Sequence, residues 1–220
     1  MKKTHLIIAF VMAPSLFIGQ AFAGPKVGVR ASAAFITADG TETEKASGAK
    51  TNGSTGANGA VLGIFAEYET PMGITVGLDY VPGQADIGSA TRIDKNTIVN
   101  PATDVTNKAS AEVEGLITAY ASYPVGDALY IKAGLSTVSI NTTESLGTGT
   151  TYGNENVTGY MAGVGADHEM DNGMFLRVEG TYTVFDETTF SGSLDSDNVR
   201  NKIAAEVQGL QVGVAIGKEF

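Results

Sequence analysis

The chain has 220 residues, the length of one ordinary domain, and carries 14 Lys and Arg against 24 Asp and Glu, a formal net charge of −10. This acidic balance opposes binding to nucleic acid, whose phosphates attract basic surfaces. The chain has no cysteine, so its stability has to come from backbone hydrogen bonds and packing rather than from disulfides.

The first 23 residues predict a secretory signal peptide. Lys2 and Lys3 form a basic start, an apolar stretch runs from Leu6 to Phe17, and Ala21-Phe22-Ala23 supplies the small residues of a cleavage site. An uncleaved anchor helix is the alternative, but the apolar stretch is shorter than the roughly 20 residues that span a bilayer. We therefore expect residues 1–23 to be removed and residues 24–220 to form the mature domain.

Apolar and polar residues then alternate in many short stretches, which is the period of a β-strand. The last stretch is the clearest, because Leu210, Val212, Val214, Ile216 and Phe220 share one face. Eight strands are predicted in this way, and in the fourth Leu116 and Ile117 compete for the same face. The predicted strands are Val27–Ile36, Val61–Glu69, Ile74–Val81, Ser110–Tyr123, Leu129–Ile140, Val157–Glu169, Met174–Phe185 and Ile203–Phe220.

The connections between these strands alternate in length. Three are short: Glu69–Gly73, Pro124–Asp127 and Glu169–Gly173. The others are long and rich in Thr, Ser, Asn and Gly, and run over Thr37–Gly59, Gly83–Lys108, Asn141–Asn156 and Asp186–Lys202. Short turns at one end and long loops at the other are typical of outer-membrane barrels. The sequence thus predicts an all-β fold, an eight-stranded antiparallel up-and-down transmembrane β-barrel in the cell outer membrane.

The two faces of the strands predict two environments. Apolar residues such as Ile131, Val164 and Val178 are expected to face lipid, with aromatic residues at both ends of the apolar band. The opposite face carries charges that would fill the lumen as a structural network. Because a barrel of eight strands has room for little more than side chains, we favour a polar plug over a narrow ion path. The predicted lumen charges are Arg30, Glu67, Asp79, Glu112, Glu114, Lys132, Asp167, Arg177 and Glu179.

With these features the chain resembles the small eight-stranded outer-membrane barrels, namely the transmembrane domain of outer membrane protein A and the opacity-type surface proteins. The resemblance covers about Pro25 to Phe220 and rests on the architecture and on the last strand. It implies that Phe220 is the signal read by the outer-membrane assembly machinery, although Lys218 stands where many members have an aromatic residue. It also implies contact with membrane lipid and lipopolysaccharide, and variable external loops.

No chemistry-bearing constellation stands out, so we expect neither an enzyme nor a cofactor. His5 belongs to the leader, and His168 has no serine beside it on its strand and lies next to a short turn. Asp195 and Asp197 have a calcium-like spacing but lack the glycine and glutamate of a calcium loop. Gly147–Gly153 resembles a phosphate loop with no helix after it.

The leading functional hypothesis is a structural outer-membrane barrel with external polar loops, which contributes to envelope integrity or to surface interactions. The alternatives are an adhesin or binding barrel and a narrow porin-like channel. The long connections offer few large anchors for a tight interface, namely Leu146, Tyr152, Phe190 and Leu194. The ligand of such loops, the conductance of the lumen and the oligomeric state stay open at this point.

Overall fold

The computed structural model describes residues 24–43, 48–96, 103–146, 151–193 and 202–220. Over these ranges the protein forms nine antiparallel strands in one sheet. No helix in the described ranges is long and apolar enough to cross a membrane. The strands are β1 (Pro25–Thr43), β2 (Lys50–Glu69), β3 (Thr75–Asn96), β4 (Thr103–Pro124), β5 (Leu129–Ser145), β6 (Glu155–Glu169), β7 (Met174–Phe185), β8 (Thr188–Ser191) and β9 (Lys202–Glu219).

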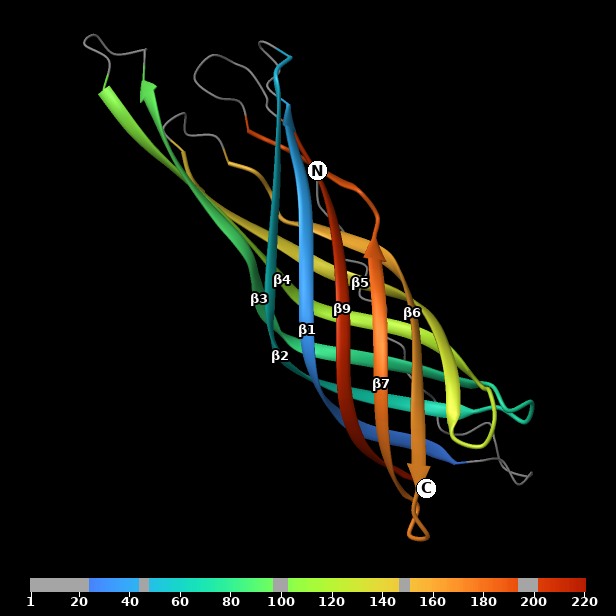
Figure 1. Cartoon of the computed structure of the whole chain (residues 1–220). Helices are drawn as coiled ribbons and strands as arrows, with labels where there is room; N and C mark the ends of the chain where they lie inside the picture. The colour runs from blue at the N-terminus through green and yellow to red at the C-terminus, as the bar shows by residue number, and fades with distance from the viewer. Residues whose placement is uncertain (1–23, 44–47, 97–102, 147–150, 194–201) are drawn as a thin grey trace, which may run out of the picture.

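The sheet closes on itself as a barrel (Figure 1). β1 pairs along its length with β2 on one side and with β9 on the other, from Lys26–Glu219 to Thr43–Lys202. The short β8 follows β7 after two residues and pairs with the same strand, β9. β7 and β8 therefore share one place in the wall, and eight long strands make up the described barrel. The predicted all-β, antiparallel barrel is confirmed.

The long connections predicted between the strands are wrong in extent. β1 continues to Thr43 and β2 already begins at Lys50, so most of Thr37–Gly59 is a paired hairpin. β3 and β4 likewise pair up to Asn96 and Thr103, and β5 runs to Ser145. Both faces of these stretches are polar, so the apolar alternation used to predict strands is absent from them. They still form strands, because backbone pairing does not depend on that alternation. We call this side of the barrel the hairpin end and the opposite side, with the three short turns, the turn end.

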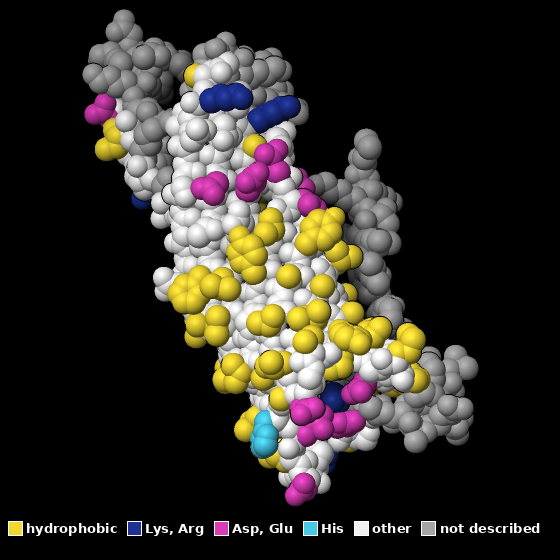
Figure 2. Space-filling model, turned by 45° about the vertical axis from the view of Figure 1, so that its right-hand side comes forward, with side chains coloured by type: hydrophobic (Ala, Val, Ile, Leu, Met, Phe, Trp, Pro, Cys, Tyr) yellow, Lys and Arg dark blue, Asp and Glu magenta, His cyan; other side chains and the backbone are white. Residues whose placement is uncertain are grey.

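The outer surface carries an apolar band. Val178 and Leu62 are 58% and 69% exposed. Many other large apolar side chains on the outward face of the strands are exposed as well. Figure 2 shows this band on one face, with charged side chains gathered beyond both of its ends. Phe35, Leu210 and Tyr182 lie level on neighbouring strands toward the hairpin end, since each is the register partner of the next. This is the arrangement of an aromatic girdle at a membrane interface.

A β-bulge in β4 settles which of its faces is outside. Gly115 has a φ of +67°, and the pairing of β4 with β5 shifts between Glu114 and Ile117. On the turn side of the bulge Ile117 is exposed, while Leu116 packs against buried apolar residues inside the barrel. The extra residue reverses the facing of everything on the hairpin side. This bulge explains why both Leu116 and Ile117 fit the outward face in the sequence pattern.

The pairing of β2 with β3 is much shorter than the strands themselves. It runs from Glu69–Thr75 to Ile64–Tyr80 and stops there, although both strands continue toward the hairpin end. Figure 1 shows the β3–β4 hairpin leaning away from the β1–β2 hairpin beyond this point. The described wall is therefore split along one seam.

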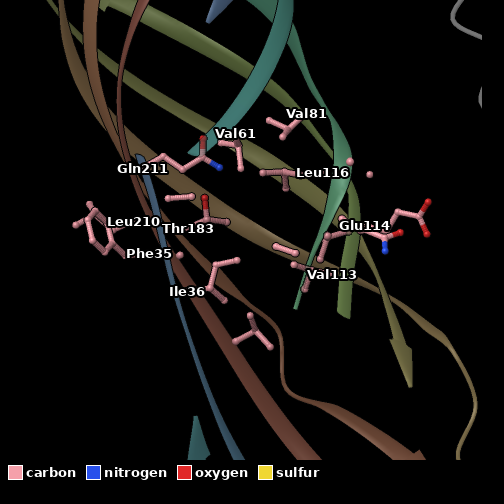
Figure 3. Close-up of a pocket in the computed structure, with 18 of the residues that line it drawn as sticks. Phe35, Ile36, Val61, Val81, Val113, Glu114, Leu116, Thr183, Leu210 and Gln211 are labelled. Atoms are coloured by element: carbon pink, nitrogen blue, oxygen red, sulfur yellow. The ribbon is translucent and has the colours of Figure 1, made fainter. Parts of the chain in front are cut away.

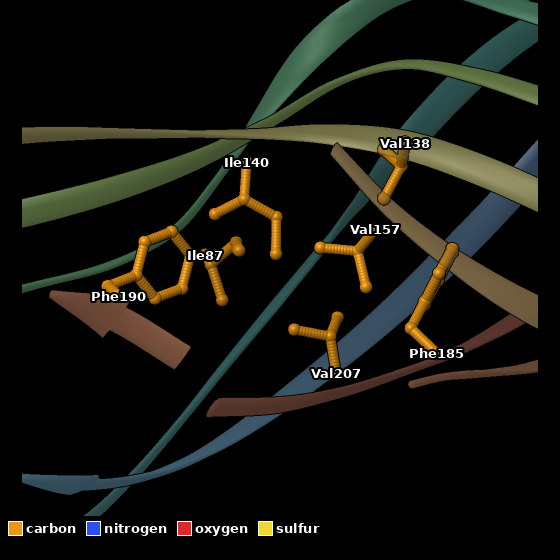
Figure 4. Close-up of a cluster of buried hydrophobic side chains, with 7 residues drawn as sticks. All are labelled: Ile87, Val138, Ile140, Val157, Phe185, Phe190 and Val207. Carbon is orange, nitrogen blue, oxygen red and sulfur yellow. The ribbon is translucent and has the colours of Figure 1, made fainter. Parts of the chain in front are cut away.

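Inside the hairpin half of the barrel lies an apolar cluster (Figure 4). Its side chains come from five long strands and from β8, and all are less than a tenth exposed. The sequence pattern predicts a polar filling for the whole lumen, and this apolar cluster corrects that prediction. Its members are Ile87, Val138, Ile140, Val157, Phe185, Phe190 and Val207.

Candidate functional site

Glu179 is the centre of a buried ion cluster in the middle of the lumen. Its Oε1 accepts a hydrogen bond from Arg30 Nη1 at 2.9 Å, and its Oε2 accepts one from Lys132 Nζ at 2.9 Å. Tyr130 Oη donates to the same Oε2 at 2.6 Å. Arg30 Nη2 in turn donates to Asp79 Oδ1 at 2.9 Å. Each charge here has an opposite charge in contact, the condition under which buried ions are tolerated.

Arg177 forms a second cluster nearer the turn end. Its Nη1 and Nη2 donate to the two carboxylate oxygens of Glu67 at 2.6 and 3.0 Å, the bidentate geometry that favours arginine. Its Nε and Nη2 also donate to the two oxygens of Asp167. Tyr120 Oη donates to Glu67 at 2.6 Å. The Lys132 ammonium lies 3.6 Å from the centre of the Tyr120 ring, which joins this cluster to that of Glu179.

Together the two clusters, which we call the charge network, link every long strand of the described barrel. Little free space remains where Arg30, Asp79 and Lys132 meet: the cavity beside them has a volume of about 10 Å³. One water molecule needs about 10–15 Å³ measured in this way. The network takes one side chain or more from each of β1 to β7 and from β9, namely Arg30, Glu67, Asp79, Tyr120, Tyr130, Lys132, Asp167, Arg177, Glu179 and Gln211.

Seven of the nine charges predicted to fill the lumen lie in the network: Arg30, Glu67, Asp79, Lys132, Asp167, Arg177 and Glu179. The other two, Glu112 and Glu114, do not. The Glu114 side chain is exposed and accepts a hydrogen bond from Asn141 Nδ2 at 2.9 Å, and the half-buried Glu112 shares its face. Both residues lie on the hairpin side of the Gly115 bulge, where the facing of β4 is reversed. A parity count that does not include the bulge places them inside by mistake.

Two polar members of the network were not predicted from the sequence. Tyr120 lies two residues from Thr118 and has the same inward facing, and Gln211 faces inward from β9, where Arg30 Nη2 donates to it at 3.2 Å. Phe65 and Phe175, whose rings lie 5.1 and 5.2 Å from the guanidinium carbon of Arg177, were not predicted either. For these two phenylalanines the signal was present, because each lies two positions from an inward-facing charge, Glu67 or Arg177.

Two spaces flank the network. Toward the turn end, a polar mouth of about 420 Å³ is lined by Lys26, Glu69, Asp167 and Arg177 among others. Lys26 forms ion pairs there with Glu69, Glu169 and Glu219 at 3.3 to 3.5 Å. Toward the hairpin end, a mostly apolar cavity of about 290 Å³ lies between the network and the apolar cluster (Figure 3). Its lining includes Ala34, Val61, Val81, Val138 and Phe185.

Of the candidate loop anchors, two fall inside the barrel instead of outside. Phe190 is 4% exposed within the apolar cluster, and Tyr152 packs against the same cluster. Burial, with the charges of Glu42 and Glu144 nearby, raises the pKa of the Tyr152 phenol to about 12. Leu194 and the acidic pair Asp195 and Asp197 lie outside the described residues, as do the whole of the predicted signal peptide and most of the Gly147–Gly153 loop.

His168 is exposed at the turn end of β6. In the part of the chain that the structure describes, no three His, Cys, Asp or Glu side chains are grouped so that they could hold a metal ion. The carboxylates of the network are held by its cations and by the hydroxyl groups of Tyr120 and Tyr130, which donate to Glu67 and Glu179.

Comparison with known proteins agrees with this geometry. The model of the outer membrane protein beta-barrel domain matches residues 5–216. The chain belongs to this family, and its place is the outer membrane. No curated protein matches the chain. In this class of barrel the short turns face the periplasm, so we expect the hairpin end to lie on the outside.

Several solved structures share the fold. The outer membrane protease OmpT of Escherichia coli superposes with a TM-score of 0.56 at 12% identity, covering 92% of this chain and 99% of its own. AlkL, solved by solid-state NMR in lipid bilayers, gives 0.51 at 14% identity, with 100% and 97% covered. OprG of Pseudomonas aeruginosa gives 0.50 at 15% identity, with 90% and 97% covered. At these identities the likeness concerns the fold, and the roles of such barrels differ.

Proposed function

We propose that the protein is a structural barrel of the outer membrane whose lumen is closed to ions, and that it contributes to the integrity of the envelope. The observation that carries this proposal is the charge network, to which all eight long strands contribute. A path for hydrated ions would need water beside the charges, and the space between Arg30, Asp79 and Lys132 is about 10 Å³.

The rival proposal is a narrow channel lined by the same charges. The two differ in what the charges do: in a plug they hold one another, and in a channel they are solvated. Conductance of the purified full chain in planar bilayers separates them. The closed barrel predicts no steady current, and Glu179→Gln, which weakens the contacts to both Arg30 and Lys132, is expected to admit a small leak. Steady, ion-selective current through the unaltered protein would overturn the plug.

A surface-binding role receives less support from the described residues. Interfaces of high affinity rely on exposed aromatic or large apolar anchors, and Phe190 is instead buried within the barrel. The polar outer ends of the β1–β2 and β3–β4 hairpins would nevertheless lie beside lipopolysaccharide, and we include loose contact with it in the proposal.

We propose further that assembly depends on the last strand. β9 closes the barrel by pairing with both β1 and β7, and the Phe220 ring after it is 71% exposed toward the surroundings. A ring that makes few packing contacts in the folded barrel is available to the assembly machinery before the barrel folds. Phe220→Ala should lower the amount of barrel assembled in cells and leave refolding of the purified chain into detergent unchanged. An equal loss in both would assign Phe220 to stability instead.

A further inference from the structure

The seam between β2 and β3 opens and closes again. Backbone pairing ends at Ile64–Tyr80, and further out Thr55 Oγ1 donates a hydrogen bond to the Ile87 carbonyl at 3.1 Å. Between these two contacts, no backbone pairing joins residues 56–63 of β2 to residues 81–86 of β3. We call this opening the window.

The window leads to the apolar cavity. Residues from both of its edges, Ala60–Leu62 on β2 and Val81–Ala85 on β3, belong to the lining of the 290 Å³ space. Figure 3 shows Val61 and Val81 at this cavity, with Ile36, Val113 and Leu116 also around it. A cavity of this size lies at the lower end of the range of ligand sites.

The cavity is closed along the barrel axis. On the turn side it ends at Gln211 and Thr183, which also border the packed charge network. On the hairpin side its lining includes Val138, Phe185 and Val207, members of the buried apolar cluster. A water molecule needs two to four polar partners, and a mostly apolar wall supplies few. The sideways route through the window is therefore the natural approach for an apolar group.

The height of the window indicates what passes through it. Tyr80 and Leu62, at its inner border, are exposed on the lipid-facing side, and Phe35 of the girdle lies on the neighbouring strand. The opening thus starts at the outer interface of the membrane. Backbone groups without partners are costly against hydrocarbon, but they can bond to the polar groups of a lipid at the interface.

We propose that the window admits one acyl chain of an outer-leaflet lipid into the cavity, while the ester, amide or hydroxyl groups of that lipid bond to the unpaired edges of β2 and β3. The wall would then hold a lipid as a fixed part of the barrel. This site lies beyond the charge network and does not depend on whether the network conducts.

The chain contains no tryptophan, so one introduced indole reports on one place. Three single variants are refolded into vesicles of phosphatidylcholine with brominated or ordinary acyl chains, since bromine quenches indole fluorescence at short range. Phe185→Trp reports on the cavity, Val184→Trp on the lipid-facing surface beside it, and Phe65→Trp on the lumen at the turn side of the network. Heat-dependent migration on a gel verifies that each variant is folded.

If an acyl chain occupies the cavity, brominated lipid quenches the indole at position 185 nearly as strongly as the one at 184, and far more strongly than the one at 65. Adding Ala34→Phe, which fills the cavity from β1, should restore most of the emission at position 185. The matched change on the lipid-facing neighbour, Ala33→Phe, should restore none of it.

Three results would overturn the proposal. The first is quenching at position 185 no greater than at position 65. The second is quenching that Ala34→Phe leaves unchanged, because bromine then acts through the barrel wall. The third is a red-shifted emission at position 185 that aqueous iodide quenches, which would mean that the cavity holds water.

Discussion

Lys132 on β5 and Glu179 on β7 lie 2.9 Å apart although β6 stands between their strands. The contact is possible because β6 has glycines at 163 and 165, where its inward side chains would otherwise stand. The charges therefore meet across the lumen instead of along the wall. Ion pairs between neighbouring strands would leave the centre of the lumen open, whereas these contacts fill it.

Removing the carboxylate of Glu179 should be strongly destabilising. Glu179→Ala leaves Arg30 and Lys132 without their shared partner, and breaking a buried ion pair on one side costs about 3–5 kcal/mol. The urea midpoint in detergent micelles measures the loss. Glu114→Ala is the matched control, because this exposed carboxylate should contribute within about 0.5 kcal/mol. Equal effects of the two changes would contradict the placement of Glu179 at the centre of the network.

The glycine at 165 should be required for the same contact. A methyl group there would meet the phenol of Tyr130, which donates to Glu179. Gly165→Ala is thus expected to cost about 1–3 kcal/mol through overpacking. At Gly180 on β7 an added methyl meets nothing within 4 Å, so Gly180→Ala should shift the unfolding midpoint little. Unfolding of both variants in the same detergent makes the comparison, and a tolerated Gly165→Ala would show that Tyr130 can move without loss.

Much of the barrel could be predicted from the sequence because its wall follows a local rule. Alternation places Val178 outside and Arg177 and Glu179 inside without knowledge of any neighbour. The same rule fails at one inserted residue, since the alternation before Gly115 does not indicate that the facing reverses there. The rule also does not predict the polar continuations of β1 to β4, because these form through backbone pairing alone.

The partners within the lumen could not be predicted. Which carboxylate Arg30 reaches depends on strand tilt and on distances across the barrel, and these are set by the closed sheet as a whole. The apolar cluster had a local signal that was not used, since Val138 and Ile140 continue the inward facing of Lys132 and Ser136. The window also had a local signal, since Pro82 has no N–H for the ladder and stands just beyond Tyr80, where the β2–β3 pairing ends.

The lipid-facing band can be tested with one charge. Val178 is 58% exposed and lies between Ala166 and Val214 of the adjacent strands. Val178→Arg should cost about 2–4 kcal/mol in a lipid bilayer if the position is near the midplane. Thr189→Arg, on β8 outside the band, should cost no more than about 1 kcal/mol. Unfolding in vesicles measures both, and a small cost at Val178 would place the band elsewhere.

Tyr152 should make the hairpin end sensitive to alkali. Its phenol has a pKa of about 12 in the folded protein, raised chiefly by burial, against about 10 for an unfolded chain. The neutral phenol is therefore favoured by folding, and this contribution is complete below pH 10 and is lost as the pH rises toward 12. The phenolate absorbance of unaltered protein minus that of Tyr152→Phe should show one group titrating near 12. A difference spectrum centred near pH 10 would mean that Tyr152 is solvated.

The bulge at Gly115 gives the last prediction. Its φ of +67° is a left-handed conformation, and an added methyl group would meet nothing within 4 Å, so any cost of substitution there lies in the backbone. For an ordinary residue this conformation costs about 1–2 kcal/mol, and a β-branched side chain is among the least suited to it. Gly115→Val should therefore destabilise the barrel by at least that amount, whereas Gly115→Asn should be milder, since Asn adopts the conformation more readily. Unfolding midpoints of the two variants in the same detergent check the order. If Val and Asn are tolerated equally, the strand has rebuilt its register without the bulge, and Glu114 would then face the lumen as simple alternation predicts.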